Sequence, residues 1–129
     1  MPEPIPRETD ETAKAIVDCA FKVHSTLGPG LLESIYQTCL VYELEKRDLS
    51  VDRQVNVPVM YDGRRFNTGL RLDLLVNDCV VVELKAVETL LPVFNAQLLT
   101  YLKLSSKRLG LLINFNVPVI KDGIKRLAL

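Results

Sequence analysis

The chain has no excess of charge of either sign, because sixteen lysines and arginines balance sixteen aspartates and glutamates among its 129 residues. A neutral chain has no long-range field that would draw the whole molecule to nucleic acid or to an anionic membrane. Any contact with nucleic acid must therefore come from a local patch of basic residues.

Cysteine is scarce and apolar runs are short. The three cysteines, Cys19, Cys39 and Cys79, form neither a CxxC motif nor a Cys/His spacing, which argues against a disulfide framework and against structural zinc. No apolar run approaches the roughly 18 residues that a membrane span needs, and the acidic, proline-rich residues 1–10 contain no apolar signal-peptide core. We expect no secretion, no membrane contact and a location in the reducing cytoplasm.

The chain does contain enough apolar material for one core. Its hydrophobic content of 48% and its length of 129 residues suit a single domain. We expect this domain to fill residues 1–129, with residues 1–9 as a flexible N-terminal segment. The sequence shows no internal repeat and no low-complexity segment.

The first third of the chain predicts two helices. Thr9 and Asp10 are suited to cap a helix whose apolar residues recur at steps of three and four up to Leu27. Gly28-Pro29-Gly30 ends this helix. A second helix follows at once, with its buried stripe between residues 32 and 44.

From residue 51 onward the apolar pattern changes to a period of two, which is typical of strands. A third helix is expected over residues 93–106, with Pro92 in its first turn. The expected strands are residues 51–61, which end at the turn signal Asp62-Gly63, about 66–76 and 79–82, which together form a meander, and 109–115. A final hairpin of residues 118–121 and 124–129 follows and counts as one element. The order ααβββαββ predicts an α/β fold with a central mixed sheet flanked by helices.

Charged residues occur in two strands that are otherwise apolar. Asp73 interrupts the run 70–76, and Glu83 and Lys85 follow directly on the apolar residues 80–82. Buried charges are costly unless they are paired or bind a metal, so these residues are candidates for a site. Glu83 and Lys85 are two apart on one strand and leave the same face. The alternative is a structural salt-bridge cluster on a partly exposed strand face.

The turn between these strands decides whether Asp73 joins Glu83. A two-residue loop, 77–78, would place Asp73 opposite Val82 and turn it away from Glu83. A three-residue loop, 77–79, places Asp73 directly across from Glu83, and a bulge has the same effect. We predict the three-residue loop or its bulged equivalent.

A pair of carboxylates at short distance is repulsive, and a hard divalent cation with oxygen ligands is the usual remedy. We therefore expect Asp73 and Glu83 to hold a cation, Mg²⁺ in the first instance. Such a cation polarises a phosphodiester and lowers the pKa of a bound water. Lys85 is then placed to hold the attacking hydroxide or to stabilise charge on the phosphate.

Residues of the helices are further candidates for this site. Gln97 and Tyr101 are one turn apart on the third helix, where the amide can orient water or phosphate and the hydroxyl can donate to phosphate. Glu33 and Tyr36 share a face of the second helix, and Glu33 is a candidate for an additional metal ligand. As alternatives, Glu33 is a first-turn carboxylate favoured by the helix dipole, and the two tyrosines are core rings with satisfied hydroxyls.

Candidates for substrate contacts also lie outside the strands. Tyr36 is one, and His24 in the last turn of the first helix is another, with a capping or dipole role as its alternative. Two basic groups are plausible phosphate contacts, with a solvated surface as the default: Arg64-Arg65, and the set Lys103, Lys107 and Arg108.

Residues 30–36 read GxxExxY, and from about Ala13 to Leu129 the chain resembles the GxxExxY protein family. The segments that carry the resemblance are Leu27-Gly28-Pro29-Gly30, Arg71-Leu72-Asp73, Val82-Glu83-Leu84-Lys85, Gln97-Leu98-Leu99-Thr100-Tyr101-Leu102 and Leu111-Leu112-Ile113-Asn114-Phe115. That family is placed in the PD-(D/E)xK nuclease superfamily. The resemblance therefore implies a restriction-endonuclease-like αβββαβ core with a metal site where its second and third strands diverge.

The resemblance also implies roles for individual residues. These are metal ligands for Asp73 and Glu83, the catalytic lysine for Lys85, an accessory helix pair for Gln97 and Tyr101, and an acidic residue on the first core helix for Glu33. Arg71, close to Asp73 in the sequence, is a further candidate for a substrate contact.

The functional hypothesis is a nuclease that depends on Mg²⁺ or Mn²⁺ and hydrolyses phosphodiesters of nucleic acid, in the first instance DNA. Two alternatives use the same fold without cleavage. One is a nucleic-acid-binding module, and the other is a protein-interaction component, for instance in a defence or toxin–antitoxin system. A homodimer is a possible assembly, because many small nucleases must pair to cut two strands.

Overall fold

Helices and strands follow one another largely in the order that the apolar pattern predicts. The structure, a computed structural model, describes residues 3–129. Within this range its elements are α1 (Arg7–Leu27), α2 (Glu33–Lys46), β1 (Val51–Asn56), β2 (Val59–Tyr61), β3 (Arg64–Phe66), β4 (Arg71–Val76), β5 (Val80–Lys85), α3 (Pro92–Ser105), β6 (Leu109–Asn114), the short 3₁₀ helix η1 (Ile120–Gly123) and β7 (Ile124–Ala128).

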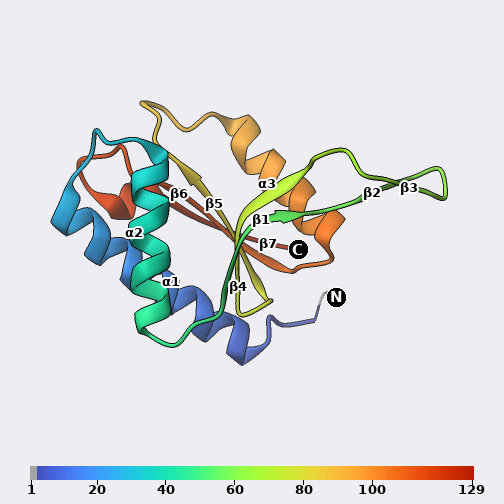
Figure 1. The fold of residues 1–129 in the computed structure, drawn as a ribbon, viewed down its shortest axis with the longest axis horizontal. Helices are drawn as coiled ribbons and strands as arrows, with labels where there is room; N and C mark the ends of the chain where they lie inside the picture. Colours follow the sequence, from blue (N-terminus) through green and yellow to red (C-terminus); the bar gives the residue numbers. More distant parts are fainter. Residues whose placement is uncertain (1–2) are drawn as a thin grey trace.

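The central sheet has five strands in the order β1-β4-β5-β6-β7, and β2 and β3 form a separate two-stranded sheet. Strands β5 and β6 run parallel, whereas the other neighbouring pairs of the large sheet are antiparallel. Helix α3 lies in the crossover between the two parallel strands, as such a connection requires. Figure 1 shows this arrangement. The predicted α/β fold, a restriction-endonuclease-like sheet flanked by helices, is confirmed.

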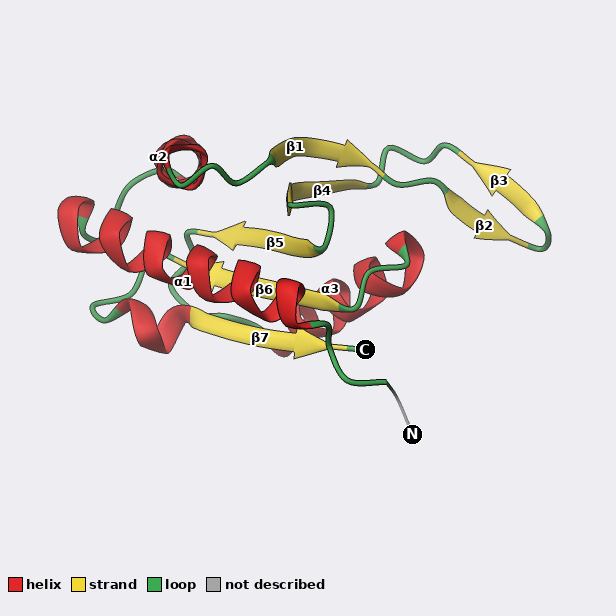
Figure 2. Cartoon of the chain, turned by 90° about the horizontal axis from the view of Figure 1, so that it is seen from below, coloured by secondary structure: helices red, strands yellow, loops and turns green. Residues whose placement is uncertain are grey.

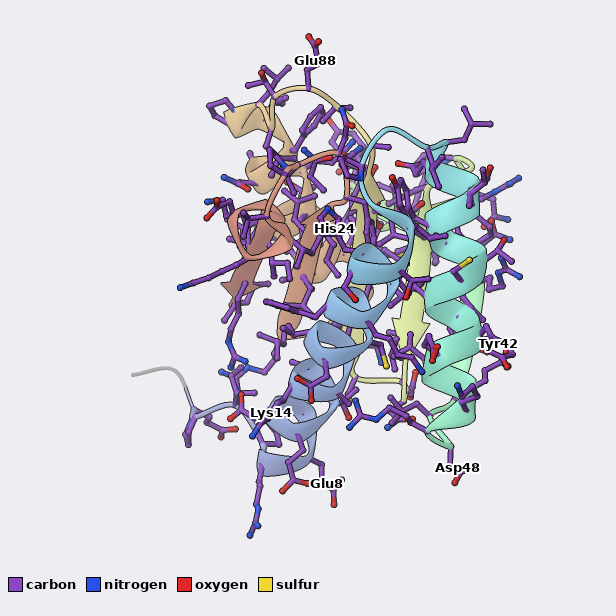
Figure 3. The ribbon with its side chains drawn as sticks, turned by 90° about the vertical axis from the view of Figure 1, so that its left-hand side faces the viewer. Glu8, Lys14, His24, Tyr42, Asp48 and Glu88 are labelled. Carbon is purple, nitrogen blue, oxygen red and sulfur yellow. The ribbon has the colours of Figure 1, made fainter. Side chains whose placement is uncertain are left out.

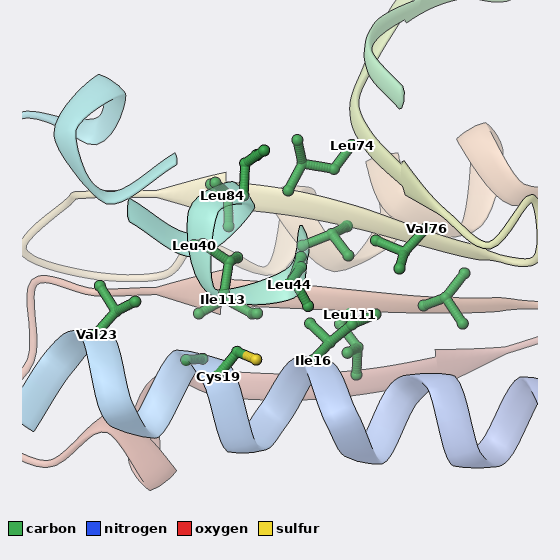
Figure 4. Close-up of a cluster of buried hydrophobic side chains, with 14 of the residues drawn as sticks. Ile16, Cys19, Val23, Leu40, Leu44, Leu74, Val76, Leu84, Leu111 and Ile113 are labelled. Carbon is green, nitrogen blue, oxygen red and sulfur yellow. The ribbon is translucent and has the colours of Figure 1, made fainter. Parts of the chain in front are cut away.

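The two faces of the sheet pack against different helices. On β5, Val80, Val82 and Leu84 belong to the core cluster with α1 and α2 that Figure 4 shows, whereas Val81 belongs to the cluster with α3. Successive side chains of a strand point to opposite faces, so β5 is covered on both. Burial on both faces explains its nearly continuous apolar sequence.

Helix α1 begins earlier than the sequence predicts. Its N-cap is Pro6, which provides no side-chain cap, and Arg7 is the first helical residue. The predicted caps Thr9 and Asp10 therefore lie inside the first turn, where the Asp10 N–H already donates to the Pro6 carbonyl. The helix also takes in residues 7–9 of the segment that was expected to be flexible; residues 1 and 2 of that segment lie outside the described residues.

The single strand predicted over residues 51–61 is in fact two strands. β1 ends at Asn56, and Pro58, which has no N–H to donate, separates it from β2. β2 pairs with β3, and the chain turns back at Gly69, which has a φ of 81°, before β4 begins at Arg71. The meander of β1, β4 and β5 is confirmed, as is the turn at Asp62-Gly63, but β2 and β3 on either side of this turn form a separate hairpin that was not predicted.

The hairpin predicted at the C-terminal end is wrong. Residues 118–121 do not form a strand; Ile120–Gly123 form η1, and β7 pairs antiparallel with β6 instead. Gly123 lies so close to the Asn114 carbonyl that a Cβ there would clash with it. This close approach seats η1 against the end of β6.

Candidate active site

The turn between β4 and β5 has the three-residue length that the sequence predicts. Val76 pairs with Val80, so residues 77–79 form the loop, and the ladder continues to the pair Leu74 and Val82. The next residue on each strand is Asp73 on β4 and Glu83 on β5. The predicted juxtaposition of these two carboxylates is confirmed.

The backbone hydrogen bonds between β4 and β5 give way to side-chain hydrogen bonds at Asp73 and Glu83. The Asp73 N–H donates to Glu83 Oε1 at 3.1 Å, and the Leu84 N–H donates to Asp73 Oδ2 at 2.9 Å. Side chains thus replace the cross-strand carbonyls as acceptors, as the two strands diverge. One oxygen of each carboxylate is used in this way, and the second oxygen of each remains for another ligand.

Where β4 diverges from β5, the side chains of β4 no longer alternate regularly between the two faces of the sheet. Leu72 and Leu74 are two residues apart, yet Leu72 packs in the cluster under α3 and Leu74 in the cluster under α1 and α2. On β1, Gln54 lies opposite Asp73 between two paired positions and has a φ of 51°, in the left-handed region. The backbone of both strands therefore twists at Asp73 and aims its carboxylate toward β5.

Lys85 shares a face of the sheet with Glu83. Val81, Glu83 and Lys85 are spaced two residues apart on β5, so their side chains leave the same face of the sheet. Val81 packs in the cluster under α3, so this face is the one that α3 covers. The Lys85 ammonium lies 4.5 Å from the centroid of the Phe94 ring of α3. This cation–π contact anchors the amine on α3. From there its charge still acts on Glu83.

The surroundings of Glu83 disfavour its ionised form. Glu83 is only 6% exposed, and its burial, together with the negative charge of Asp73, raises the pKa of Glu83 to about 8. Lys85 acts in the opposite direction but offsets only part of this shift. Ionising Glu83 beside Asp73 is therefore costly in the protein alone, and a cation bound to the pair would offset that cost.

Two further groups from different helices lie within the field of this pair. Burial and the charge of Asp73 raise the pKa of Glu33 at the start of α2, while Lys85 lowers it. Burial, followed by the charges of Glu83 and Asp73, raises the pKa of Tyr101 on α3. The fold thus brings α2, α3, β4 and β5 to one locus.

Gln97 is exposed on α3. It is three residues from Phe94, which contacts Lys85, and four from Tyr101, so the three side chains follow one flank of the helix. This flank borders the carboxylates. Gln97 touches none of the site residues through a hydrogen bond within residues 3–129, and its role stays a prediction.

The predicted set of three carboxylate ligands is not assembled as a cluster. Within the described part of the chain, no three residues among histidine, cysteine, aspartate and glutamate come together in a way that could hold a metal ion. The structure brings Asp73 and Glu83 into contact, and Glu33 shares only their electrostatic field. Glu33 as a direct metal ligand therefore stays a prediction.

Tyr36 is a core residue and not a substrate contact. Its side chain is fully buried, its ring stacks on Phe115 with a centroid distance of 4.6 Å, and its hydroxyl donates to the Gly28 carbonyl at 2.6 Å while accepting from the Leu31 N–H. The GxxExxY tyrosine thus ties down the loop between α1 and α2. Every polar atom of the side chain is already used inside the protein.

His24 is also buried and has a structural partner. Its Nε2 lies 2.7 Å from the Val117 carbonyl, so the last turn of α1 is bound to the segment that follows β6. Figure 3 marks the position of His24 on α1. This contact favours the structural alternative for His24, and a substrate contact stays a prediction. Arg71, in contrast, is exposed at the start of β4, two residues before Asp73.

The structure adds Asn114, to which the sequence assigned no individual role. It is 1% exposed and lies opposite Lys85 in the parallel ladder. Its side chain accepts from the Val87 N–H and donates to the Val87 carbonyl, and thereby fixes the segment directly after Lys85. An asparagine at the end of an apolar strand was the available signal.

Comparison with protein-family models matches almost the whole chain to a known superfamily. The model described as the PD-(D/E)XK nuclease superfamily matches residues 10–127. The chain therefore belongs to the PD-(D/E)XK nuclease superfamily, whose members generally use divalent metal ions. The likeness to GxxExxY proteins remains a resemblance within it.

The other comparisons add no relative. Neither a curated protein nor a solved structure was found to match the chain. In the described residues, no helix has both the length and the apolar character to cross a bilayer.

Proposed function

We propose that the protein is a metal-dependent nuclease that hydrolyses phosphodiester bonds of DNA. The observation that carries this proposal is the meeting of Asp73 and Glu83 where β4 and β5 diverge, with Lys85 on the same face. Membership of a nuclease superfamily supports the reaction class.

The donor set fits Mg²⁺ or Mn²⁺. Both candidate ligands are carboxylates, which hard cations prefer, and one oxygen of each is free of the backbone hydrogen bonds that orient it. Magnesium retains several waters and takes only one or two protein carboxylates, so a pair is sufficient. When bound, the ion would polarise the phosphodiester and lower the pKa of a coordinated water.

The protein's own groups supply the rest of the chemistry. Lys85, held over Phe94, would orient the attacking water or stabilise negative charge that develops on the phosphate. Tyr101 and Gln97 would donate to phosphate oxygens from α3. Glu33, whose carboxylate lies in the field of Asp73 and Lys85, would orient a water or join the metal ligands.

A cleavage assay on duplex DNA tests the proposal. We expect cleavage with Mg²⁺ or Mn²⁺ and none with a chelator, and we expect the Asp73→Asn and Lys85→Ala variants each to lose roughly 100-fold or more in rate. Asp52→Asn on β1 and Lys125→Ala on β7, both exposed residues away from the site, are matched controls that should retain activity.

Two results would reject the proposal. Cleavage that survives in both site variants would assign the activity to another site or to a contaminant. DNA binding without cleavage, in any of the divalent ions, would identify the protein as the non-catalytic binding module instead.

A further inference from the structure

The β2–β3 hairpin contributes almost nothing to the core. Five of its six strand residues are exposed and the sixth is half-buried, with Met60 60% and Tyr61 73% exposed. It extends away from the central sheet beyond β1 and β4, as Figures 1 and 2 show. A two-stranded hairpin is marginally stable by itself, and its exposed edges invite pairing with other chains. A binding partner would give this arrangement a function.

Basic charge is concentrated on and around this hairpin. Residues 53–71 contain four arginines against the single acid Asp62, a net charge of +3, which leaves the remainder of a neutral chain at −3. All four arginines are exposed, and none forms an ion pair with any residue in the range 3–129: Arg53, Arg64, Arg65 and Arg71. This is the local basic patch that a neutral protein needs for nucleic acid.

The register of the hairpin puts an arginine on each of its faces. Tyr61 is paired with Arg64, and Met60 is paired with Arg65, so the two arginines are on opposite faces, each beside an exposed apolar side chain. A ribbon of this kind suits a groove with phosphates along both walls. The major groove of B-form DNA admits a two-stranded ribbon, whereas that of A-form RNA is too narrow for protein side chains.

The base of the hairpin adjoins the active site. The hairpin connects β1 to β4, and β4 starts only two residues before Asp73. Beside this base lies a pocket of about 440 Å³ whose polar lining includes Arg65, Asn67 and Thr68. A duplex with one phosphate at Asp73 would therefore continue past the hairpin.

We propose that the β2–β3 hairpin is a DNA-binding ribbon that enters the major groove of a B-form duplex next to the scissile phosphate, with Arg64 and Arg65 contacting phosphates on its two walls. The position of the cut rests on the proposed function, whereas the binding surface does not. The ribbon makes double-stranded DNA the substrate class.

The test separates binding from cleavage. Affinity for a short DNA duplex is measured with a chelator present, over a series of salt concentrations, for the wild type, Arg64→Ala/Arg65→Ala and the control Lys121→Ala/Lys125→Ala, which removes the same charge from exposed positions on η1 and β7. Hydrolysis of the small diester bis(4-nitrophenyl) phosphate with Mn²⁺ reports on the active site alone. An RNA duplex of the same sequence is the competitor.

We expect the arginine variant to bind DNA roughly tenfold or more weakly at ~0.1 M salt, and its salt-dependence slope to fall by about 2 in magnitude, because two phosphate contacts are lost. The lysine variant should bind like the wild type, both variants should hydrolyse the small diester at the wild-type rate, and the RNA duplex should compete poorly.

If the two variants lose the same affinity for DNA, the loss is due to net charge and not to the hairpin, and the inference is overturned. Unchanged DNA binding with an altered oligomeric state would make the hairpin a contact between copies of the chain, and an RNA duplex that binds as tightly as DNA would exclude the groove. A further outcome is that the wild type shows no cleavage while the arginine variant still binds DNA more weakly than the wild type. That result would reject the proposed nuclease function and support the hairpin as a DNA-binding surface.

Discussion

The two ends of the β4–β5 hairpin have opposite chemistry. At the turn end, Leu75 pairs with Val81 and Val76 with Val80 in an ordinary backbone ladder, with these side chains buried on both faces. At the open end, the ladder is replaced by the carboxylates of Asp73 and Glu83, which accept backbone N–H groups across the gap.

This difference shows how a strand pair that is well packed at one end can hold two repelling carboxylates together at the other end. The apolar end fixes the register by residue count and by burial, so the acids at the other end have no freedom to separate. Their desolvation and mutual repulsion are then imposed by the fold. The turn end should therefore determine stability, and the open end should determine function at some cost in stability.

Glu83→Gln is expected to give the largest contrast between the two ends. The cleavage rate should fall roughly 10²–10³-fold, because an anionic ligand is lost. At pH 8 the free energy of unfolding should rise by about 1–3 kcal/mol, because glutamine reproduces the protonated acid without its ionisation. Chemical denaturation and the cleavage assay measure the two effects. If Glu83→Gln is active and less stable than the wild type, the proposed contrast between the two ends of the hairpin is wrong.

Val81→Ala, at the turn end, should have the reverse effect. Val81 is fully buried under α3, so its truncation should lower the free energy of unfolding by about 2–3 kcal/mol through lost burial and a cavity. Cleavage per folded molecule should stay at the wild-type level, provided the assay is run well below the melting temperature. A loss of specific activity would show that the two ends are not independent.

The pH dependence of stability should come from the open end. Because the folded state raises the pKa of Glu83 from 4.5 to about 8, this group's contribution is fully present below about pH 4.5 and is lost as the pH rises toward 8. Without metal, the melting temperature of the wild type should therefore fall relative to Glu83→Gln between pH 5 and 8. Added Mg²⁺ should stabilise the wild type more at pH 8 than at pH 5, since the ion competes with the proton. Parallel curves for the two proteins would contradict the raised pKa.

Tyr36→Phe should have the smallest effect, and it tests the assignment of this residue to the core. Loss of the hydroxyl leaves the Gly28 carbonyl and the Leu31 N–H without a partner, at a cost of about 1–2 kcal/mol in unfolding free energy. The stacked contact with Phe115 remains. KM for DNA should be unchanged, and a raised KM would restore Tyr36 as a substrate contact.

The carboxylate pair was predictable because register in a tight hairpin follows from counting residues. Once three residues form the loop, Asp73 must lie opposite Glu83. The face shared by Glu83 and Lys85 followed in the same way from the two-residue period of a strand. These are local rules, and local rules can be applied to a sequence without coordinates.

Features that depend on distant contacts were not predictable. Tyr36 and His24 looked like site residues, but their partners, Phe115 and Val117, lie far away in the sequence. The turn at Asp62-Gly63 was predictable, but the separation of β2 and β3 from the central sheet was not, because the alternating pattern continues through Pro58. The distance of Glu33 from the carboxylate pair depends on how α2 packs on the sheet, which no short motif specifies.

The most direct test of the central claim is a crystal structure of the protein soaked in Mn²⁺, with the ion located by its anomalous scattering. We expect one manganese between the carboxylates of Asp73 and Glu83, bound by the oxygens that do not accept the Asp73 and Leu84 N–H groups, with Lys85 nearby. Density for manganese elsewhere, or none at this pair at saturating Mn²⁺ and pH 8, would contradict it.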